Sequence, residues 1–281
     1  MSEINIGTIN IIFNSNMNSA QEMIPAAKRC EDGPAEAPVK IVTWADGTDE
    51  EIVAMVKAAD EGLIDLKDYW NVGDVRKVML SETEGCEWYT SHSRQEAEFV
   101  LMNAGGKALL TPTESGRTTC SFVVGLKDCL KEEDKINKED TNEGGWETSD
   151  VRKWCNDGFA QSIPQTLQPI FKNFVNATYA NGKVVETTDL FALPAEVEVY
   201  GSTEYSAQGE GAQFEFYKNP LNRIKCLGSG GYQAHWWERS PHSSDSTGFC
   251  GVNSNGNADN YYTSARRTLV GWPLSAVSNI N

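Results

Sequence analysis

Residues 236–267 read WWERSPHSSDSTGFCGVNSNGNADNYYTSARR. The polar window, defined as residues 242–267 of this stretch, contains no Lys, Glu, Gln, Met or Trp, although those five types make up 62 of the 281 residues. Roughly six would be expected in a window of that length from the overall composition. The residues that remain are mostly small and polar, with Tyr, His and Arg among them, and this mixture favours binding over catalysis.

Two explanations of the composition remain open. Loop-rich segments favour Asn, Asp, Gly and Ser, because these residues tolerate left-handed backbone or bond to their own main chain. Alternatively, randomising both adenines of an Asn codon of the AAC type yields Asn, Ser, Asp, Tyr, His, Thr, Gly, Ala and Arg, and never the five missing types. The composition therefore also matches the output of adenine-directed mutagenesis.

The residues beside and within the window predict short strands. Neighbouring strand residues face opposite sides, so we expect one of Trp236 and Trp237 to be buried and the other to point elsewhere. Pro241 fixes its own φ and, together with Arg239, is expected to set the path of the chain into the following loop. An apolar scaffold strand between two polar loops is predicted at Phe249, Cys250 and Val252.

Upstream of this region the clearest local signal is a helix. The sequence TDEEIVAMVKAADEG begins with a capping box, Thr48 followed by Glu51, and predicts a helix that ends near Gly62. The apolar run 9–13 reads as strand-like, and EDGPAEAP interrupts regular structure. We therefore expect an N-terminal arm and helix over residues 1–67, as a region for assembly, and a ligand-binding domain over residues 68–281.

The rest of the chain mixes strand and helix patterns. Strands are expected in VGDVRKVML, after a turn at Gly73-Asp74, and in AEFVLMN and TTCSFVVG. TSDVRKWCNDGFAQSIPQTLQPIFKNF predicts a helix capped by Ser149 or Asp150 and a second short helix after a turn that Pro164 opens. FALPAEVEVYG and the glycine-rich GSGG indicate a return to strands and turns. This arrangement predicts an α+β fold.

Charge and cysteine content narrow the classes of partner. The formal net charge is -16, so a phosphate backbone or an anionic membrane surface would not attract the chain. No run is long and apolar enough to insert in a membrane, and the first residues lack the pattern of a secretory signal, so synthesis in the cytoplasm is expected. The seven cysteines show no C-x-x-C spacing, which favours buried free thiols.

Six segments carry a family resemblance. They are DYWNVGD (68–74), TNEGGWETSDVRKWCN (141–156), LFALPAEVEVYGS (190–202), NRIKCLG (222–228), WWERSP (236–241) and FCGVNSNGNA (249–258). In this order they resemble an uncharacterised bacterial and prophage domain family related to the C-type lectin fold. Its members look like the variable proteins of diversity-generating retroelements, in which a lectin-like scaffold presents side chains diversified through an adenine-directed reverse transcriptase.

This resemblance implies a role in ligand binding, often on a phage particle. The expected ligand is a protein or glycan on a host or cell surface, and the chain is expected to assemble as a homo-oligomer or onto a phage particle. One departure concerns the end of the chain, where many relatives carry a Gly-Val-Arg-Pro motif and this chain has LVGWPL at 269–274. Apolar residues are retained there, so a final strand is still expected.

Residues of two kinds follow from the window and the resemblance. We expect adjacent Tyr261 and Tyr262 to be exposed and to contribute most to binding, since aromatic side chains bring a large contact area. Trp146, Trp236, Trp237, Arg239 and Pro241 are expected to be structural. The full set of candidate contact residues is His235, His242, Asp245, Asn253, Asn257, Asp259, Asn260, Tyr261, Tyr262, Arg266 and Arg267.

Two alternative functions remain. A structural module of a virion or surface assembly would use the window only as loop. A cysteine-dependent enzyme is the weaker alternative, because the formylglycine-generating enzymes resemble lectins in fold, yet neither Cys226 nor Cys250 has a partner at short spacing. No zinc or EF-hand pattern occurs among the His residues or around Asp245 and Asp259. We therefore expect neither catalysis nor a cofactor.

Overall fold

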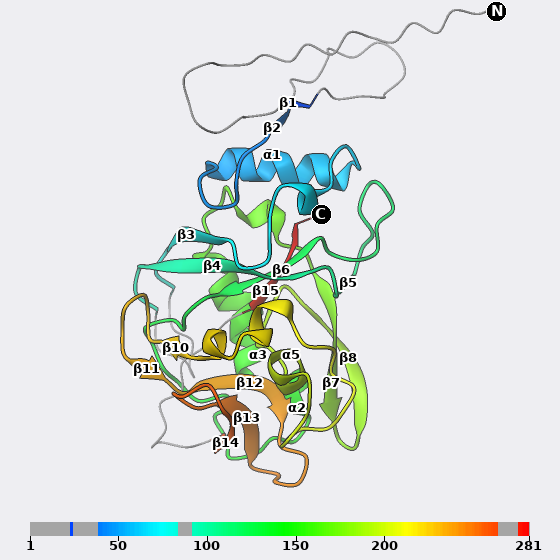
Figure 1. The fold of residues 1–281 in the computed structure, drawn as a ribbon. Helices are drawn as coiled ribbons and strands as arrows, with labels where there is room; N and C mark the ends of the chain where they lie inside the picture. The colour runs from blue at the N-terminus through cyan, green and yellow to red at the C-terminus, as the bar shows by residue number, and fades with distance from the viewer. Residues whose placement is uncertain (1–22, 25–38, 84–91, 264–274, 281) are drawn as a thin grey trace, which may run out of the picture.

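The computed structural model describes residues 23–24, 39–83, 92–263 and 275–280. Over these residues the fold is mixed, with several small antiparallel sheets and few helices, which confirms the predicted α+β class. Helix α1 (Asp49–Asp60) lies at one end of the molecule in Figure 1, and the sheet of β12 (Trp236–Pro241), β13 (Gly248–Val252) and β14 (Ala258–Tyr262) lies at the other. No described helix is long and apolar enough to cross a membrane.

Helix α1 begins where the sequence predicts. The Thr48 hydroxyl accepts a hydrogen bond from the Glu51 amide at 3.3 Å, and the Glu51 carboxylate accepts one from the Thr48 amide at 2.9 Å, so the capping box is present. Its apolar side, including Ile52 and Met55, is buried in the same hydrophobic core as the sheets. Residues on both sides of the boundary that we expected at residue 67 therefore contribute to this core.

A five-stranded antiparallel sheet follows α1 in Figure 1, in the order β3-β4-β6-β15-β9. It confirms the three strands predicted upstream, because β3 (Val75–Leu80), β4 (Gln95–Ala104) and β6 (Phe122–Leu126) lie within or across those segments. The C-terminal strand β15 (Ser275–Ile280) lies between β6 and β9 (Phe191–Ala192). The end of the chain thus returns to a sheet begun more than 150 residues earlier.

The predicted helix after residue 149 is present but divided. It comprises α3 (Asp150–Trp154), a π-helical turn η2 (Cys155–Phe159) and α4 (Ala160–Ser162), with the Ser149 hydroxyl capping the Arg152 amide at 3.3 Å. The short α2 (Gly145–Thr148) precedes it, and the second predicted helix is a 3-10 turn, η3 (Gln168–Ile170). The adjoining sheet has the order β5 (Ala108–Leu109), β7 (Phe174–Ala180) and β8 (Lys183–Asp189).

One predicted stretch of strand and turn is wrong. Within FALPAEVEVYG only β9 is a strand, and the following residues form helix α5 (Glu196–Tyr200). The alternating valines imitate a strand, and Ala195 at the start gives no capping signal that the sequence would reveal. The helix is instead started by the side chain of Glu198, which accepts a hydrogen bond from the Ala195 amide at 2.9 Å.

The remaining elements are short. GSGG forms a turn between β10 (Lys225–Cys226) and β11 (Gln233–Ala234), and both Gly228 and Gly230 have positive φ. Among the cysteines in the described residues, four are free and buried and Cys226 is partly buried. Cys30 and Cys86 lie outside the described residues, as does the strand-like run 9–13. The other elements are β1 (Met23–Ile24), β2 (Val39–Lys40), η1 (Leu66–Asp68), η4 (Glu215–Lys218) and η5 (Pro220–Arg223).

Candidate functional site

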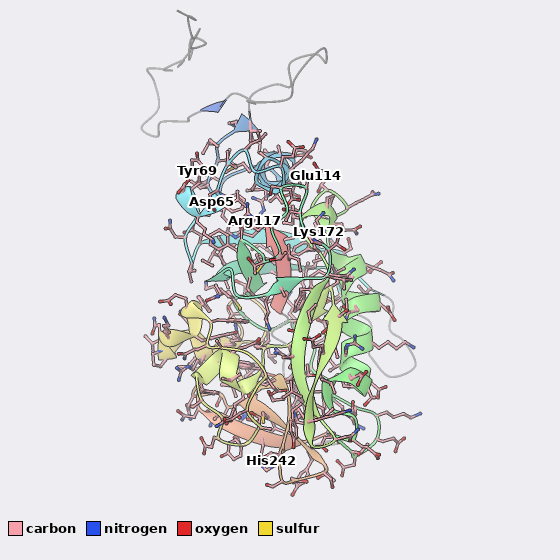
Figure 2. All side chains as sticks on the ribbon, turned by 90° about the vertical axis from the view of Figure 1, so that its right-hand side faces the viewer. Asp65, Tyr69, Glu114, Arg117, Lys172 and His242 are labelled. Carbon is pink, nitrogen blue, oxygen red and sulfur yellow. The ribbon has the colours of Figure 1, made fainter. Side chains whose placement is uncertain are left out.

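The polar window is built on a sheet with one partly exposed strand. Every residue of β12 and β13 is buried, whereas β14 is the edge strand of the three, with its first three residues half-buried and Tyr262 60% exposed. Two buried strands therefore hold a third whose side chains reach solvent. Figure 2 places His242, at the start of the window, at the opposite end of the molecule from Asp65 and Tyr69.

Both tryptophans of β12 are fully buried, which corrects the expectation that only one would be. As neighbours in one strand they face opposite sides of the sheet. The indole nitrogen of Trp236 donates to the Arg223 carbonyl at 2.9 Å, and that of Trp237 donates to the Asp134 carbonyl at 3.0 Å. Protein covers each face of β12, so opposite orientation does not imply exposure. The pair supports the site from within and makes no contact with solvent.

Tyr261 is also buried, at 8% exposure, so the expectation of two adjacent exposed tyrosines is wrong. Its ring lies edge-on to that of Trp237, with the centroids 5.6 Å apart, and crosses the sheet above Gly251. The Tyr261 hydroxyl lies 2.7 Å from Nδ1 of His235 and 3.2 Å from Oδ2 of Asp259. Three predicted contact residues thus form one hydrogen-bonded cluster at the surface, with Tyr261 as its buried centre.

Several window side chains are occupied in shaping turns. Nδ1 of His242 accepts from the Asp245 amide at 3.0 Å, and the Asp245 carboxylate accepts from the Thr247 amide at 2.9 Å. The Asn253 side chain accepts from the amides of Asn255 and Asn257 at 3.0 and 3.2 Å. At these positions the turn explanation of the composition has direct support.

The β12–β13 loop is also fixed from outside the window. Nδ2 of Asn142 lies within hydrogen-bond distance of three carbonyl oxygens, those of His242 at 3.2 Å, Asp245 at 2.7 Å and Gly248 at 2.8 Å. All three contacts are to main chain. The loop backbone is therefore held by an amide that lies about 100 residues earlier in the sequence.

Beside β14 lies a polar groove of about 420 Å³. Arg223 from η5 stacks over the ring of Tyr200 from α5, with its guanidinium carbon 4.8 Å from the ring centroid, and its Nε donates to the Tyr217 carbonyl at 3.1 Å. Within the described residues its Nη atoms have no hydrogen-bond partner. The groove, defined by its lining residues, comprises Glu196, Tyr200, Ser202, Glu204, Arg223, Asn257 and Ala258.

A buried network of charged side chains includes Glu198 of α5, the helix that contributes Glu196 and Tyr200 to the groove. Arg239 pairs with Glu198, which also accepts from Lys107, and all three side chains are almost fully buried. Burial would raise the pKa of Glu198, but the positive charges of Arg239 and Lys107 lower it to about 2. Arg239 also donates to the Leu193 carbonyl at 3.0 Å, so it joins β12 to the chain ahead of α5.

One member of this region has no partner. Glu238 is fully buried, and neither of its carboxyl oxygens has a hydrogen bond within the described residues. Burial raises the pKa of Glu238 well above its ordinary value, and the nearby carboxylates of Glu196, Glu210 and Glu198 raise it further. These effects favour the protonated form of the Glu238 carboxyl.

The thiols of this region have raised pKa values. Burial raises the pKa of the Cys250 thiol well above its ordinary value, so the nucleophilic thiolate is disfavoured. Burial and Asp128 likewise raise the pKa of the partly buried Cys226. In the described part of the chain, no three His, Cys, Asp or Glu side chains are grouped so that they could hold a metal ion.

The structure places the predicted contact residues in several different settings. His235, Asp259 and Tyr261 form the surface cluster, and His242, Asp245 and Asn253 shape turns. Asn257 lines the groove, while Asn260 and Tyr262 lie on β14. Arg266 and Arg267 lie outside the described residues. The residues that we expected to be structural are all buried: Trp146, Trp236, Trp237, Arg239 and Pro241.

Sequence reasoning missed most of the groove. Tyr200, Glu204 and Arg223 lie between 34 and 62 positions ahead of Asn257 and Tyr262 in the chain, and no local pattern connects them. Only one signal was present in the sequence. The segments LFALPAEVEVYGS and NRIKCLG, which carry part of the resemblance, contain Tyr200 and Arg223.

Comparison with known proteins gives one match. The family model described as "Domain of unknown function (DUF6273)" matches residues 121–269, a span that runs from just before β6 to beyond β14. No curated protein and no solved structure matches the chain.

Proposed function

The chain belongs to the DUF6273 family, whose matched span includes all three strands of the β12–β14 sheet, and we propose that this sheet is a ligand-binding surface. Its proposed ligand is a protein or glycan on a host or cell surface. The proposed carrier is a phage or prophage product, assembled as a homo-oligomer or onto a phage particle. Binding here needs no metal, cofactor or covalent step.

One observation carries the proposal. The edge strand β14 presents Asp259, Asn260 and Tyr262 to solvent while β12 and β13 behind it are buried throughout. A rigid support lowers the loss of conformational entropy when a ligand binds, and a surface of Tyr, Asn and Asp offers aromatic area with adaptable hydrogen bonds. The groove beside β14 adds a concave, polar element to the same surface.

We propose further that the scaffold is C-type lectin-like and that the window is diversified. In support of a lectin-like scaffold, the C-terminal strand β15 pairs with both β6 and β9, and the window lies on a separate three-stranded sheet. In support of diversification, the partly exposed positions of the window carry several types of polar residue, while its strand β13 is apolar and buried.

Sequencing the DNA on either side of the gene tests diversification. A nearby reverse transcriptase gene and a second, near-identical copy of the codons for residues 242–267, differing only at adenines, are expected. A flanking sequence without that copy would leave a binding surface of fixed sequence and would remove the diversified one.

A pair of tyrosine variants tests binding itself. Two tyrosines are exposed to a similar extent: Tyr262 on β14, at 60%, and Tyr232, which precedes β11 and is not part of the three-stranded sheet, at 67%. We expect Tyr262→Ala to reduce adsorption of the purified chain to a panel of bacterial cell surfaces roughly tenfold, as loss of an aromatic contact residue does. Tyr232→Ala, the matched control, should adsorb like the unaltered chain. Equal adsorption by both variants would exclude β14 from the binding surface.

The second candidate function is a structural module of a virion or surface assembly. The turn-forming roles of His242, Asp245 and Asn253 favour it, because these side chains serve the fold whether or not a ligand binds. In that case alanine at Asn260 and Tyr262 would leave adsorption unchanged while particle assembly continued. A cysteine-dependent enzyme is less well supported, since burial disfavours the Cys250 thiolate.

A further inference from the structure

The hydrogen-bond pattern of β14 leaves one row of main-chain groups directed outward. The amide of Asn253 donates to the Asn257 carbonyl at 2.9 Å, and the amide of Thr263 donates to the Thr247 carbonyl at 2.8 Å. These two bonds lie at either end of the β13–β14 ladder, in which Gly251 is opposite Asp259. Alternate residues of an antiparallel pair bond to the partner strand. Asp259 and Tyr261 therefore bond to β13.

The main-chain groups of the other three residues of β14 point the opposite way. By the same alternation, the amides and carbonyls of Ala258, Asn260 and Tyr262 point away from β13. Within the described residues, β14 pairs with no other strand. In the part of the chain that the structure describes, the Asn260 amide donates only to the neighbouring Asp259 carboxylate, at 2.9 Å. An edge of this kind can accept a further strand.

Among the described residues, the charged groups around this edge are mostly negative. Asp259 lies on β14 itself, Glu204 lines the groove beside its first residue, and the Asp140 carboxylate lies 3.1 Å from the Thr263 hydroxyl at its other end. Arg223 is the one cationic group of the groove lining. With a net charge of -16 on the chain, the edge is complementary to a segment that carries positive charge.

We propose that the outer edge of β14, which is unpaired among the described residues, binds an extended, basic segment of a partner protein as an added strand. This rests on the proposed function and specifies its ligand as polypeptide. Main-chain bonds to the outward groups of Ala258, Asn260 and Tyr262 give affinity, and alternate side chains of the segment give selectivity. Side chains on the Ala258 face of the sheet meet the groove, where Glu204 receives a Lys or Arg and the Nη atoms of Arg223 donate to a carbonyl or hydroxyl oxygen.

A proline substitution separates main-chain from side-chain binding. Asn260→Pro removes an outward amide and no bond to β13, and proline is tolerated where the N–H of an edge strand faces outward. Asn260→Ala, the matched control, keeps the amide and loses the same side chain. The probe is a nine-residue peptide selected from a random library for binding to the full chain. We expect selected peptides to contain Lys or Arg and to bind Asn260→Pro roughly tenfold or more weakly than Asn260→Ala.

Methylated versions of the peptide provide a second measurement. Only alternate amides of an added strand face β14. N-methylation of that set of residues should therefore abolish binding, and N-methylation of the other set should not. Equal binding to the proline and alanine variants, selection of no peptide, or insensitivity to methylation would each overturn strand addition.

Amide exchange of the unliganded chain tests the inference even if the proline variant fails to fold. The Tyr262 amide should exchange rapidly and the Tyr261 amide slowly, since only the second is bonded to β13. Slow exchange at both would show that the chain already covers its own edge, and the inference would fail. Loss of adsorption in Tyr262→Ala with equal peptide binding by both Asn260 variants would leave the proposed function standing and remove strand addition alone.

Discussion

Replacement of Glu238 by glutamine should change the pH dependence of stability. The carboxyl is fully buried, unpartnered within the described residues, and has a pKa well above its ordinary value of 4.5. Folding therefore retains a proton that the unfolded chain releases above that pH. The associated stability is fully present below pH 4.5 and is lost as the pH rises toward the pKa of the folded state. Glu238→Gln removes this loss, because its amide does not titrate.

The magnitude follows from the number of pH units involved. Each unit between the unfolded and folded pKa corresponds to about 1.4 kcal/mol. From pH 5 upward the wild-type chain should lose unfolding free energy relative to Glu238→Gln, by up to that amount per pH unit, until the pH reaches the pKa of the folded state. Burial also raises the pKa of Glu210, but that group is present in both proteins and largely cancels in the comparison. Glu198, with a pKa of about 2, titrates below the measured range.

Urea unfolding at pH 5, 6 and 7 measures the effect. Glu114→Gln is the matched control, since Glu114 is exposed and lies at the opposite end of the molecule from His242 in Figure 2. Its unfolding free energy should follow that of the wild type at all three values. Parallel pH profiles for wild type and Glu238→Gln would refute the reasoning, because they would show that Glu238 is either ionised in the fold or solvated by water.

Three further substitutions test the support of the site. Arg239→Met should lower the free energy of unfolding in urea by about 3 to 5 kcal/mol, because it leaves the buried Glu198 with Lys107 alone; a loss below about 1 kcal/mol would contradict the pairing. Gly251→Ala should cost about 1 to 3 kcal/mol and alter the near-ultraviolet circular dichroism, since a Cβ would lie 2.5 Å from the Tyr261 ring; an unchanged spectrum would count against that packing. Thr48→Ala should lower the thermal midpoint through loss of about 1 kcal/mol of helix capping, and Thr48→Ser, which keeps the hydroxyl, should not.

Elements with local signals could be predicted from the sequence. Each cap lies within four residues of the helix that it starts, so the local sequence alone reveals it. This holds for the capping box of Thr48 and Glu51 and for the cap at Ser149. Helix α5 could not be predicted, because Glu198 caps it while bonded to Lys107 and Arg239, which are 91 and 41 positions away. Its start depends on the folded core.

Only part of the site could be predicted, because the rest of it also depends on the folded core. Composition identified the polar window, and residues 258–262, which we expected to be a polar loop, form strand β14. Burial is set by what covers each face of the sheet. Strand alternation predicted that one of Trp236 and Trp237 would be exposed, and the polar window predicted that Tyr261 would be. All three are buried, because other segments of the chain cover them. The groove needs α5, η5 and β14 together, a meeting that no window of sequence contains.

The three contacts from Asn142 carry a consequence for how the loop can evolve. They reach carbonyl oxygens of His242, Asp245 and Gly248, and every amino acid possesses that oxygen. An anchor of this type cannot distinguish one side chain from another. Successive variants of the gene could therefore exchange residues along the loop while its path over the protein stayed the same.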